Sequence, residues 1–217
     1  MVVNSSTIVL SVVCIGGAVA YVIATWRNVR SAAVLAKIAA STSFVVLAVV
    51  NRAAETAYGR AILAALIFSW LGDVFLLSRH PTFLLAGIAS FLIAHIAFSG
   101  AFALQPISLA AFAIGLMATG LLSVLIVMWL WKYLDGFFRF AVPFYILAIM
   151  AMLSLAMAAS VVSLPQTVGI AALAFAVSDI SVARDRFVER DVLNKAWGLP
   201  LYYLAQLLFA VSVTGRG

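Results

Sequence analysis

Long apolar stretches separated by short polar connections run through most of this chain. An α-helix needs about 17–25 mostly apolar residues to cross the hydrocarbon core of a bilayer. Stretches of that length predict eight membrane-spanning helices, near residues 6–25, 33–50, 59–78, 82–104, 106–131, 138–161, 166–183 and 195–213. The pattern therefore predicts an all-α, polytopic membrane protein, and we expect residues 1–217 to form a single integral-membrane domain.

The composition excludes a soluble domain of ordinary type. Hydrophobic residues make up 66% of the 217, charged residues make up 9%, and the mean hydropathy is +1.22. Soluble domains are about half apolar and about a quarter charged. The net charge of +6 comes from Lys and Arg in short connections between apolar stretches. Such residues set membrane topology, so we expect no nucleic-acid partner.

The distribution of basic residues predicts an orientation. Ten of them lie in the odd-numbered connections or at the helix ends beside them: Arg27, Arg30, Lys37, Arg79, Lys132, Arg139, Arg184, Arg186, Arg190 and Lys195. The other side holds Arg52, Arg60 and Arg216. The positive-inside rule then puts both termini outside the cytoplasm. Short connections without an appended domain favour a bacterial inner membrane.

Two aspartates, Asp73 and Asp179, lie inside apolar stretches long enough to cross a bilayer. A carboxylate at the centre of a membrane helix costs roughly 2.5–3.5 kcal/mol on insertion scales. The chain has only seven acidic residues in all. Ionisable residues inside membranes are rare and mark functional sites, so these two aspartates are the first candidates for one.

Helix geometry brings other polar residues to the same depth. With a rise of 1.5 Å per residue, Asp73 and Asp179 lie roughly 8–9 Å inside the predicted cytoplasmic end of their helices, and Lys37 lies roughly 6 Å inside. Tyr145 and Tyr202 enter from the same side. We therefore expect a polar cavity in the cytoplasmic half of the bundle, with His95 at its base near the midplane.

Each of these residues also has a structural interpretation. The aspartates can form helix–helix hydrogen bonds, and Lys37 can extend its side chain to the lipid headgroups. Tyr145 and Tyr202 can belong to an aromatic belt. His95 can be a hydrogen-bonded core histidine.

Several kinds of site are excluded by the residues present. Two histidines, His80 and His95, do not supply the three or four clustered ligands that zinc requires. No G-x-S-x-G turn for a serine nucleophile and no glycine-rich phosphate loop occurs. Cys14 is the only cysteine, which excludes a disulfide framework. We expect no metal and no cofactor.

A pair of carboxylates remains as the candidate chemistry. Two such groups close together in a low-dielectric site titrate at different pH values, so that one is protonated while the other is ionised. General acid–base hydrolysis requires that combination. Inside a membrane, the natural substrate is a lipid.

A set of short motifs resembles a known family, the YhhN-like lysoplasmalogenases. The motifs are Lys37 followed by Ser41-Thr42, Tyr58-Gly59-Arg60, Leu71-Gly72-Asp73, Ala94-His95, Pro143-Phe144-Tyr145, Ser178-Asp179 and Tyr202-Tyr203-Leu204-Ala205-Gln206. Their order and spacing extend the resemblance from about residue 33 to 213. The resemblance implies eight membrane helices and hydrolysis of the vinyl ether bond of lysoplasmalogens to a fatty aldehyde and a glycerophospho-ethanolamine or -choline.

The resemblance also implies roles for individual residues. Asp73 and Asp179 match the presumed catalytic pair, and a lysophospholipid would be the substrate. The neighbouring residues, rather than the resemblance, lead us to expect that Asp73, flanked by Gly72 and apolar residues, donates the proton and that Asp179, beside Ser178, stays ionised. We also expect Lys37 to lie near the substrate phosphate. The candidate substrate-binding residues are Lys37, Thr42, His95, Tyr145, Ser178, Tyr202 and Gln206.

Two other functions remain open. Intramembrane Asp, His and Lys residues also form proton relays, so a small proton-coupled transporter is the main alternative. A non-catalytic lipid-binding protein is the other, although it leaves the two acids unexplained. Apart from membrane lipids, the residues predict no partner and no oligomeric state.

Overall fold

The computed structural model describes residues 4–78 and 80–214, which contain eight α-helices and no strand. The helices are α1 (Ser5–Trp26), α2 (Arg30–Val50), α3 (Ala57–Phe75), α4 (Pro81–Ala103), α5 (Leu109–Trp131), α6 (Phe138–Val162), α7 (Gln166–Ala183) and α8 (Val192–Ser212). A 3-10 turn, η1 (Ala53–Glu55), precedes α3, and a π-helical turn, η2 (Arg184–Val188), follows α7. The predicted all-α class is correct.

Hydrogen-bonding side chains set where several helices begin. Thr56 accepts a hydrogen bond from the Gly59 amide at the start of α3. Ser108 caps α5 through the Ala111 amide, so that helix begins three residues later than the apolar stretch suggested. Asp191 caps α8 in the same way through the Leu193 amide. Such caps satisfy amide groups that have no partner inside the helix.

Within residues 4–78 and 80–214, seven helices are long and apolar enough to cross a membrane: α1 to α6, and α7 together with η2 as Gln166–Val188. In α5 only Leu130 is buried, which leaves a nearly continuous apolar surface for lipid. Helix α8 differs, since it carries Asn194, Lys195 and Gln206. It packs against α1, α2, α3 and α7, so protein rather than lipid surrounds most of its polar groups.

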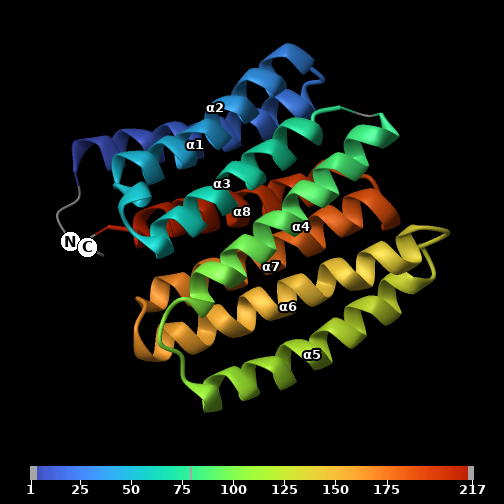
Figure 1. Cartoon of the computed structure of the whole chain (residues 1–217). Helices are drawn as coiled ribbons and strands as arrows, with labels where there is room; N and C mark the ends of the chain where they lie inside the picture. The colour runs from blue at the N-terminus through green and yellow to red at the C-terminus, as the bar shows by residue number, and fades with distance from the viewer. Residues whose placement is uncertain (1–3, 79, 215–217) are drawn as a thin grey trace.

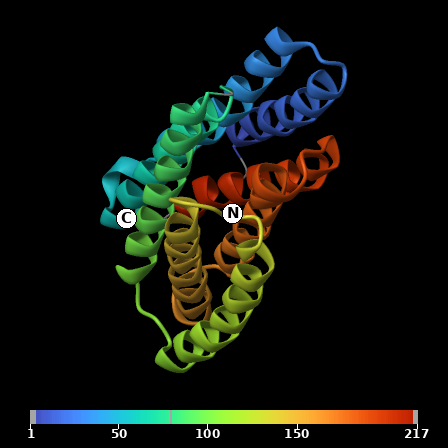
Figure 2. The ribbon, with the colours of Figure 1, turned by 90° about the vertical axis from the view of Figure 1, so that its right-hand side faces the viewer.

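Consecutive helices pair along the chain: α1 with α2, α3 with α4, α5 with α6 and α7 with α8. Helices α1 and α2 lie at one edge of the assembly and α5 and α6 at the opposite edge (Figures 1 and 2). The connections that follow α1, α3, α5 and α7 all lie at one end, on the right in Figure 1, and both labelled termini lie at the other. The side chains described next gather toward the first of these ends.

Two glycines allow close helix contacts next to the site. A Cβ atom on Gly72 of α3 would lie 2.5 Å from the Phe91 ring of α4. A Cβ atom on Gly198 of α8 would overlap the Ser181 side chain of α7. Because Gly72 and Gly198 have no side chain, α3 can lie close to α4 and α8 close to α7. Small residues commonly allow such close contact between membrane helices.

Candidate functional site

Asp73 lies near the end of α3 and is buried among donors from two other helices. Its Oδ1 is 3.0 Å from Nζ of Lys37 on α2. Its Oδ2 accepts hydrogen bonds from Ser41 Oγ at 2.6 Å and from Tyr202 OH on α8 at 2.7 Å. One cation and two hydroxyl groups therefore donate to the Asp73 carboxylate.

A further layer of contacts surrounds this ion pair. Ser41 Oγ lies 3.1 Å from the hydroxyl of Tyr203, next to Tyr202 on α8. The ammonium group of Lys37 lies 5.4 Å from the centre of the Tyr21 ring on α1, within range of a cation–π interaction. Lys37 is itself buried, with 6% of its surface exposed. It therefore does not extend to the lipid headgroups.

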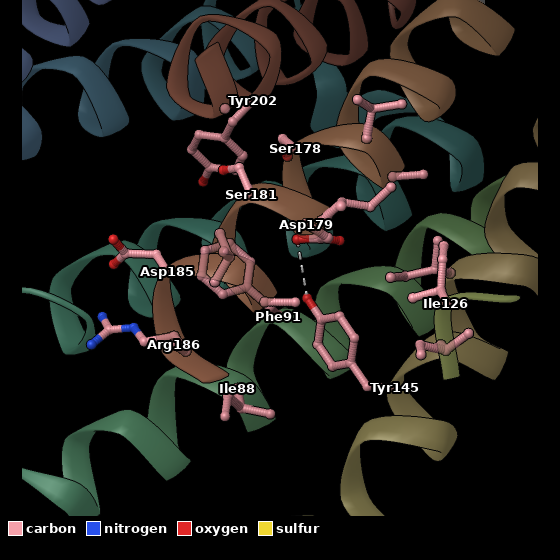
Figure 3. Close-up of a pocket in the computed structure, with 18 of the residues that line it drawn as sticks. Ile88, Phe91, Ile126, Tyr145, Ser178, Asp179, Ser181, Asp185, Arg186 and Tyr202 are labelled. Atoms are coloured by element: carbon pink, nitrogen blue, oxygen red, sulfur yellow. Dashed lines mark hydrogen bonds between the residues drawn. The ribbon is translucent and has the colours of Figure 1, made fainter. Parts of the chain in front are cut away.

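Asp179 lies near the end of α7 and has different neighbours. Tyr145 on α6 donates a long hydrogen bond of 3.4 Å to its Oδ1 and points toward it across the cavity in Figure 3. The Nε2 atom of His95 on α4 lies 3.1 Å from its Oδ2. Asp179 thus has no permanently charged partner among the described residues, in contrast to Asp73.

The orientation of His95 constrains where a proton lies. Its Nδ1 is 2.7 Å from the backbone carbonyl oxygen of Phe91. A carbonyl only accepts hydrogen bonds, so Nδ1 carries a hydrogen and Nε2 of the neutral ring is an acceptor. Nε2 and Asp179 Oδ2 are buried, lie 3.1 Å apart, and neither has a well-aligned hydrogen bond within the described residues. A proton placed between two acceptors at that distance would satisfy both.

Both aspartates lie on the wall of one cavity of about 240 Å³. Lys37, Tyr145, Ser178 and Tyr202 also line it. The rest of the wall is mostly apolar and comes largely from α4 to α7. It includes Ile88, Phe91 and Ile126, which are labelled in Figure 3, together with Ile149 and Leu153. We refer to it as the apolar cavity. The sequence predicted a polar cavity, whereas polar groups occupy only part of this wall.

Three of the predicted substrate-binding residues lie outside the apolar cavity. Thr42 is exposed and accepts a hydrogen bond of 3.1 Å from the Trp70 indole. His95 is fully buried behind Asp179. Gln206 is fully buried, and neither amide atom has a hydrogen-bond partner among the described residues.

Within the described residues, Ser178 does not form the hydrogen bond to Asp179 that was expected. Ser178 Oγ donates instead to the carbonyl of Phe175, at 2.7 Å. Serine inside a helix commonly bonds back to the preceding turn. The neighbouring serine therefore does not provide the contact that was expected to hold Asp179 ionised.

The sequence interpretation missed three charged residues of the cavity wall, namely Asp185, Arg186 and Lys195. The predicted helices left residues 184–194 in a connection, but the chain continues α7 as the π-helical turn η2. The Glu189 amide closes this turn on the carbonyl of Arg184, at 2.8 Å. Such turns often occur at functional sites.

The donor set offers no evident metal site. Across residues 4–78 and 80–214, no three His, Cys, Asp or Glu side chains lie where they could hold one ion together. The chemistry available around the two aspartates is therefore that of their carboxylates, the His95 imidazole behind Asp179, the Lys37 amine and the phenols of Tyr145 and Tyr202.

Comparison with known proteins gives a family. The model of the YhhN family matches residues 32–213. Lysoplasmalogenase TMEM86A of Bos taurus is 31% identical over 157 residues, and that of Homo sapiens is 29% identical over 157 residues. These alignments cover 70% of this chain and 64% of each relative, so the match spans less than two thirds of the relatives' length. No solved structure matches significantly. Because the family model covers most of the chain, this protein belongs to the YhhN family.

Proposed function

We propose that this protein is a membrane-embedded hydrolase that cleaves the vinyl ether bond of lysoplasmalogens. The products are a fatty aldehyde and a glycerophospho-ethanolamine or -choline. The relatives named lysoplasmalogenase support this substrate class. The observation that carries the proposal is that two carboxylates with different partners lie on the wall of one mostly apolar cavity.

Hydrolysis of a vinyl ether begins with transfer of a proton to the outer alkene carbon. The resulting oxocarbenium ion takes up water at the carbon bound to oxygen and becomes a hemiacetal. Collapse of the hemiacetal breaks the bond to the glycerol oxygen and releases aldehyde and alcohol. The reaction consumes one water and needs an acid, a base for that water, and a negative charge near the cation.

Asp179 and His95 together are the proton donor in this mechanism. The shared proton between Nε2 and Oδ2 is favoured by their 3.1 Å separation and by the bond from Nδ1 to Phe91. This assignment reverses the one expected from the sequence, in which Asp73 was the acid. The reason is that Asp73 has a lysine partner, whereas Asp179 has a histidine.

Asp73 is the ionised partner. Its negative charge is maintained by Lys37, Ser41 and Tyr202 and stabilises the oxocarbenium ion. It also accepts the proton of the attacking water. The catalyst is restored when that proton returns to the Asp179–His95 pair. Glycosidases divide labour between two carboxylates around a similar cation.

The alkenyl chain lies in the apolar cavity and the lysophospholipid enters from the surrounding membrane lipids. Burying a long chain against aliphatic side chains contributes roughly 0.8 kcal/mol per CH₂ group. We assign the protein to a bacterial inner membrane on its short connections, and we place both termini outside the cytoplasm on the distribution of its basic residues.

The test compares a 1-alkenyl lysophospholipid with its saturated 1-alkyl analogue, using purified protein in detergent. We expect aldehyde and glycerophospho product in equal amounts from the first and neither from the second, because the alkyl ether has no alkene carbon to protonate. Absence of aldehyde from folded protein would contradict the proposal. Proton-coupled uptake into proteoliposomes in its place would favour the transporter.

A further inference from the structure

A second cavity, of about 310 Å³, lies beside the apolar cavity. Its wall comes from the end of α1, the start of α2, the residues that follow α3, η2 and the start of α8. The charged residues that line it are Arg30, Arg186, Arg190, Lys195, Asp185 and Asp191. We refer to it as the basic cavity, because four cationic side chains face two acidic ones.

The two acidic residues of the basic cavity have partners of their own. Asp185 Oδ1 lies 2.9 Å from Nζ of Lys195. Asp191 caps α8 by accepting the Leu193 amide at 3.1 Å. Within the described part of the chain, no carboxylate forms an ion pair with Arg186 or Arg190. The basic cavity therefore keeps an excess of positive charge that an anion can neutralise.

Among the cations of the basic cavity, Arg186 is partly buried and uses few of its N–H donors within the described residues. Its hydrogen bond to the carbonyl of Leu76 runs from Nη2 and is long, at 3.5 Å. A guanidinium carries five N–H donors in a fork that matches the oxygens of a phosphate. The π-helical turn η2 holds Arg186 against the end of α3, beside Asp185 in Figure 3. Most of its donors are therefore available to a ligand.

The basic and apolar cavities adjoin. Five residues line both of them: Tyr21, Leu76, Asp185, Arg186 and Lys195. An amphipathic molecule can therefore lie across the boundary, with a charged group beside Arg186, a hydrocarbon chain in the apolar cavity and the atoms between them near the aspartates. Lys37, the phosphate partner expected from the sequence, lines only the apolar cavity and is paired with Asp73.

We propose that Arg186, in the basic cavity, binds the phosphodiester of a lysophospholipid headgroup. This subsite rests on the proposed function and adds to it a preference for phosphate-bearing lipids over neutral ones. Arg30, Arg190 and Lys195 supply the surrounding positive potential, and Asp185 orients Lys195.

The first experiment measures binding without turnover. A 1-alkyl lysophospholipid, which is not cleaved, is titrated by calorimetry into wild-type protein and Arg186→Gln in non-ionic detergent. Loss of a charged hydrogen-bonding partner predicts affinity at least about tenfold weaker in Arg186→Gln. Arg186→Lys keeps the charge but loses the fork, so we expect intermediate affinity. Arg27→Gln is the matched control, since exposed Arg27 lies at the same end and lines neither cavity.

Three results overturn the subsite. One is equal affinity of wild type and Arg186→Gln for the lipid. Another is an equal loss in Arg27→Gln, which indicates nonspecific charge attraction. The third is binding of inorganic phosphate as tight as that of the lipid, which indicates a free-anion site.

The second experiment separates the subsite from the proposed function. Turnover of a 1-alkenyl lysophospholipid is compared with that of a 1-alkenyl glycerol, which lacks phosphate. Arg186→Gln is expected to raise KM for the first about tenfold and to leave the second unchanged; equal effects on both overturn the subsite. A wild type that binds the alkyl lipid through Arg186 but cleaves neither alkenyl compound contradicts the proposed function alone.

Discussion

His95 presents Nε2 to Oδ2 of Asp179 at 3.1 Å, while its Nδ1 is held by a backbone carbonyl at 2.7 Å. Moving the ring hydrogen from Nδ1 to Nε2 would break the bond to the Phe91 carbonyl. A change of tautomer therefore does not remove the repulsion between Nε2 and Oδ2, which are both acceptors. In the proposed mechanism a proton shared by this pair does so, and Asp179, which lines the apolar cavity, presents that proton to the substrate. Asp73 differs from Asp179, because a lysine and two hydroxyl groups already donate hydrogen bonds to its carboxylate.

Replacing His95 with Gln should lower kcat for aldehyde release by about 10²–10⁴, the usual contribution of general acid–base catalysis. Binding of the uncleaved 1-alkyl lipid should remain, because His95 does not line the cavity. Ser99→Ala is the control, since Ser99 lies one turn further along α4 and bonds to the His95 carbonyl. A kcat in His95→Gln equal to that of Ser99→Ala would remove His95 from the mechanism.

Replacing Lys37 with Met should lower the free energy of unfolding by about 3–5 kcal/mol, because it leaves the buried Asp73 carboxylate without its cation. The measurement is denaturant unfolding in detergent. The double variant Lys37→Met/Asp73→Asn should recover much of the stability but no activity. A single Lys37→Met variant as stable as wild type would show that Asp73 is not charged in the folded protein.

Adding a methyl group at Gly72 should destabilise the contact between α3 and α4. A Cβ there would lie 2.5 Å from the Phe91 ring, and overpacking of this kind costs roughly 1–3 kcal/mol. Gly100→Ala is the matched control, because a Cβ atom at Gly100 would meet no neighbouring side chain or helix within 4 Å. Thermal unfolding should separate the two variants, and equal melting temperatures would contradict the observed helix contact.

Filling the apolar cavity should shorten the preferred substrate chain. Ala141→Phe projects a ring from α6 into the cavity, whereas Leu147→Phe enlarges an exposed side chain of the same helix. We expect Ala141→Phe to lower kcat/KM at least about tenfold for a long alkenyl chain and much less for a short one, since each buried CH₂ contributes roughly 0.8 kcal/mol. Equal losses for both chain lengths would indicate that the chain lies elsewhere.

The number of helices, and the position of two aspartates inside them, could be predicted from the sequence for physical reasons. A bilayer fixes the length of an apolar helix, and a carboxylate inside one is rare. A constant rise per residue also put Lys37 and Tyr202 at the depth of Asp73, where the structure has both in contact with it.

Contacts between helices could not be predicted in this way, because depth does not fix rotation. Ser41 contacts Asp73, whereas the adjacent Thr42 points to Trp70. The alternating charges from Arg184 onward resembled a solvated loop, and their π-helical geometry depends on the helices around them. Arg186 was therefore missed as a cavity residue.

The most direct test of the account is aldehyde release from a lysoplasmalogen by purified wild type, Asp73→Asn, Asp179→Asn and the exposed control Asp135→Asn. We predict turnover by wild type and by Asp135→Asn, and a loss of at least about 10² in kcat for the other two. Melting temperatures and binding of the 1-alkyl lipid establish that each variant is folded. A folded Asp179→Asn variant with a wild-type rate would contradict the carboxylate mechanism.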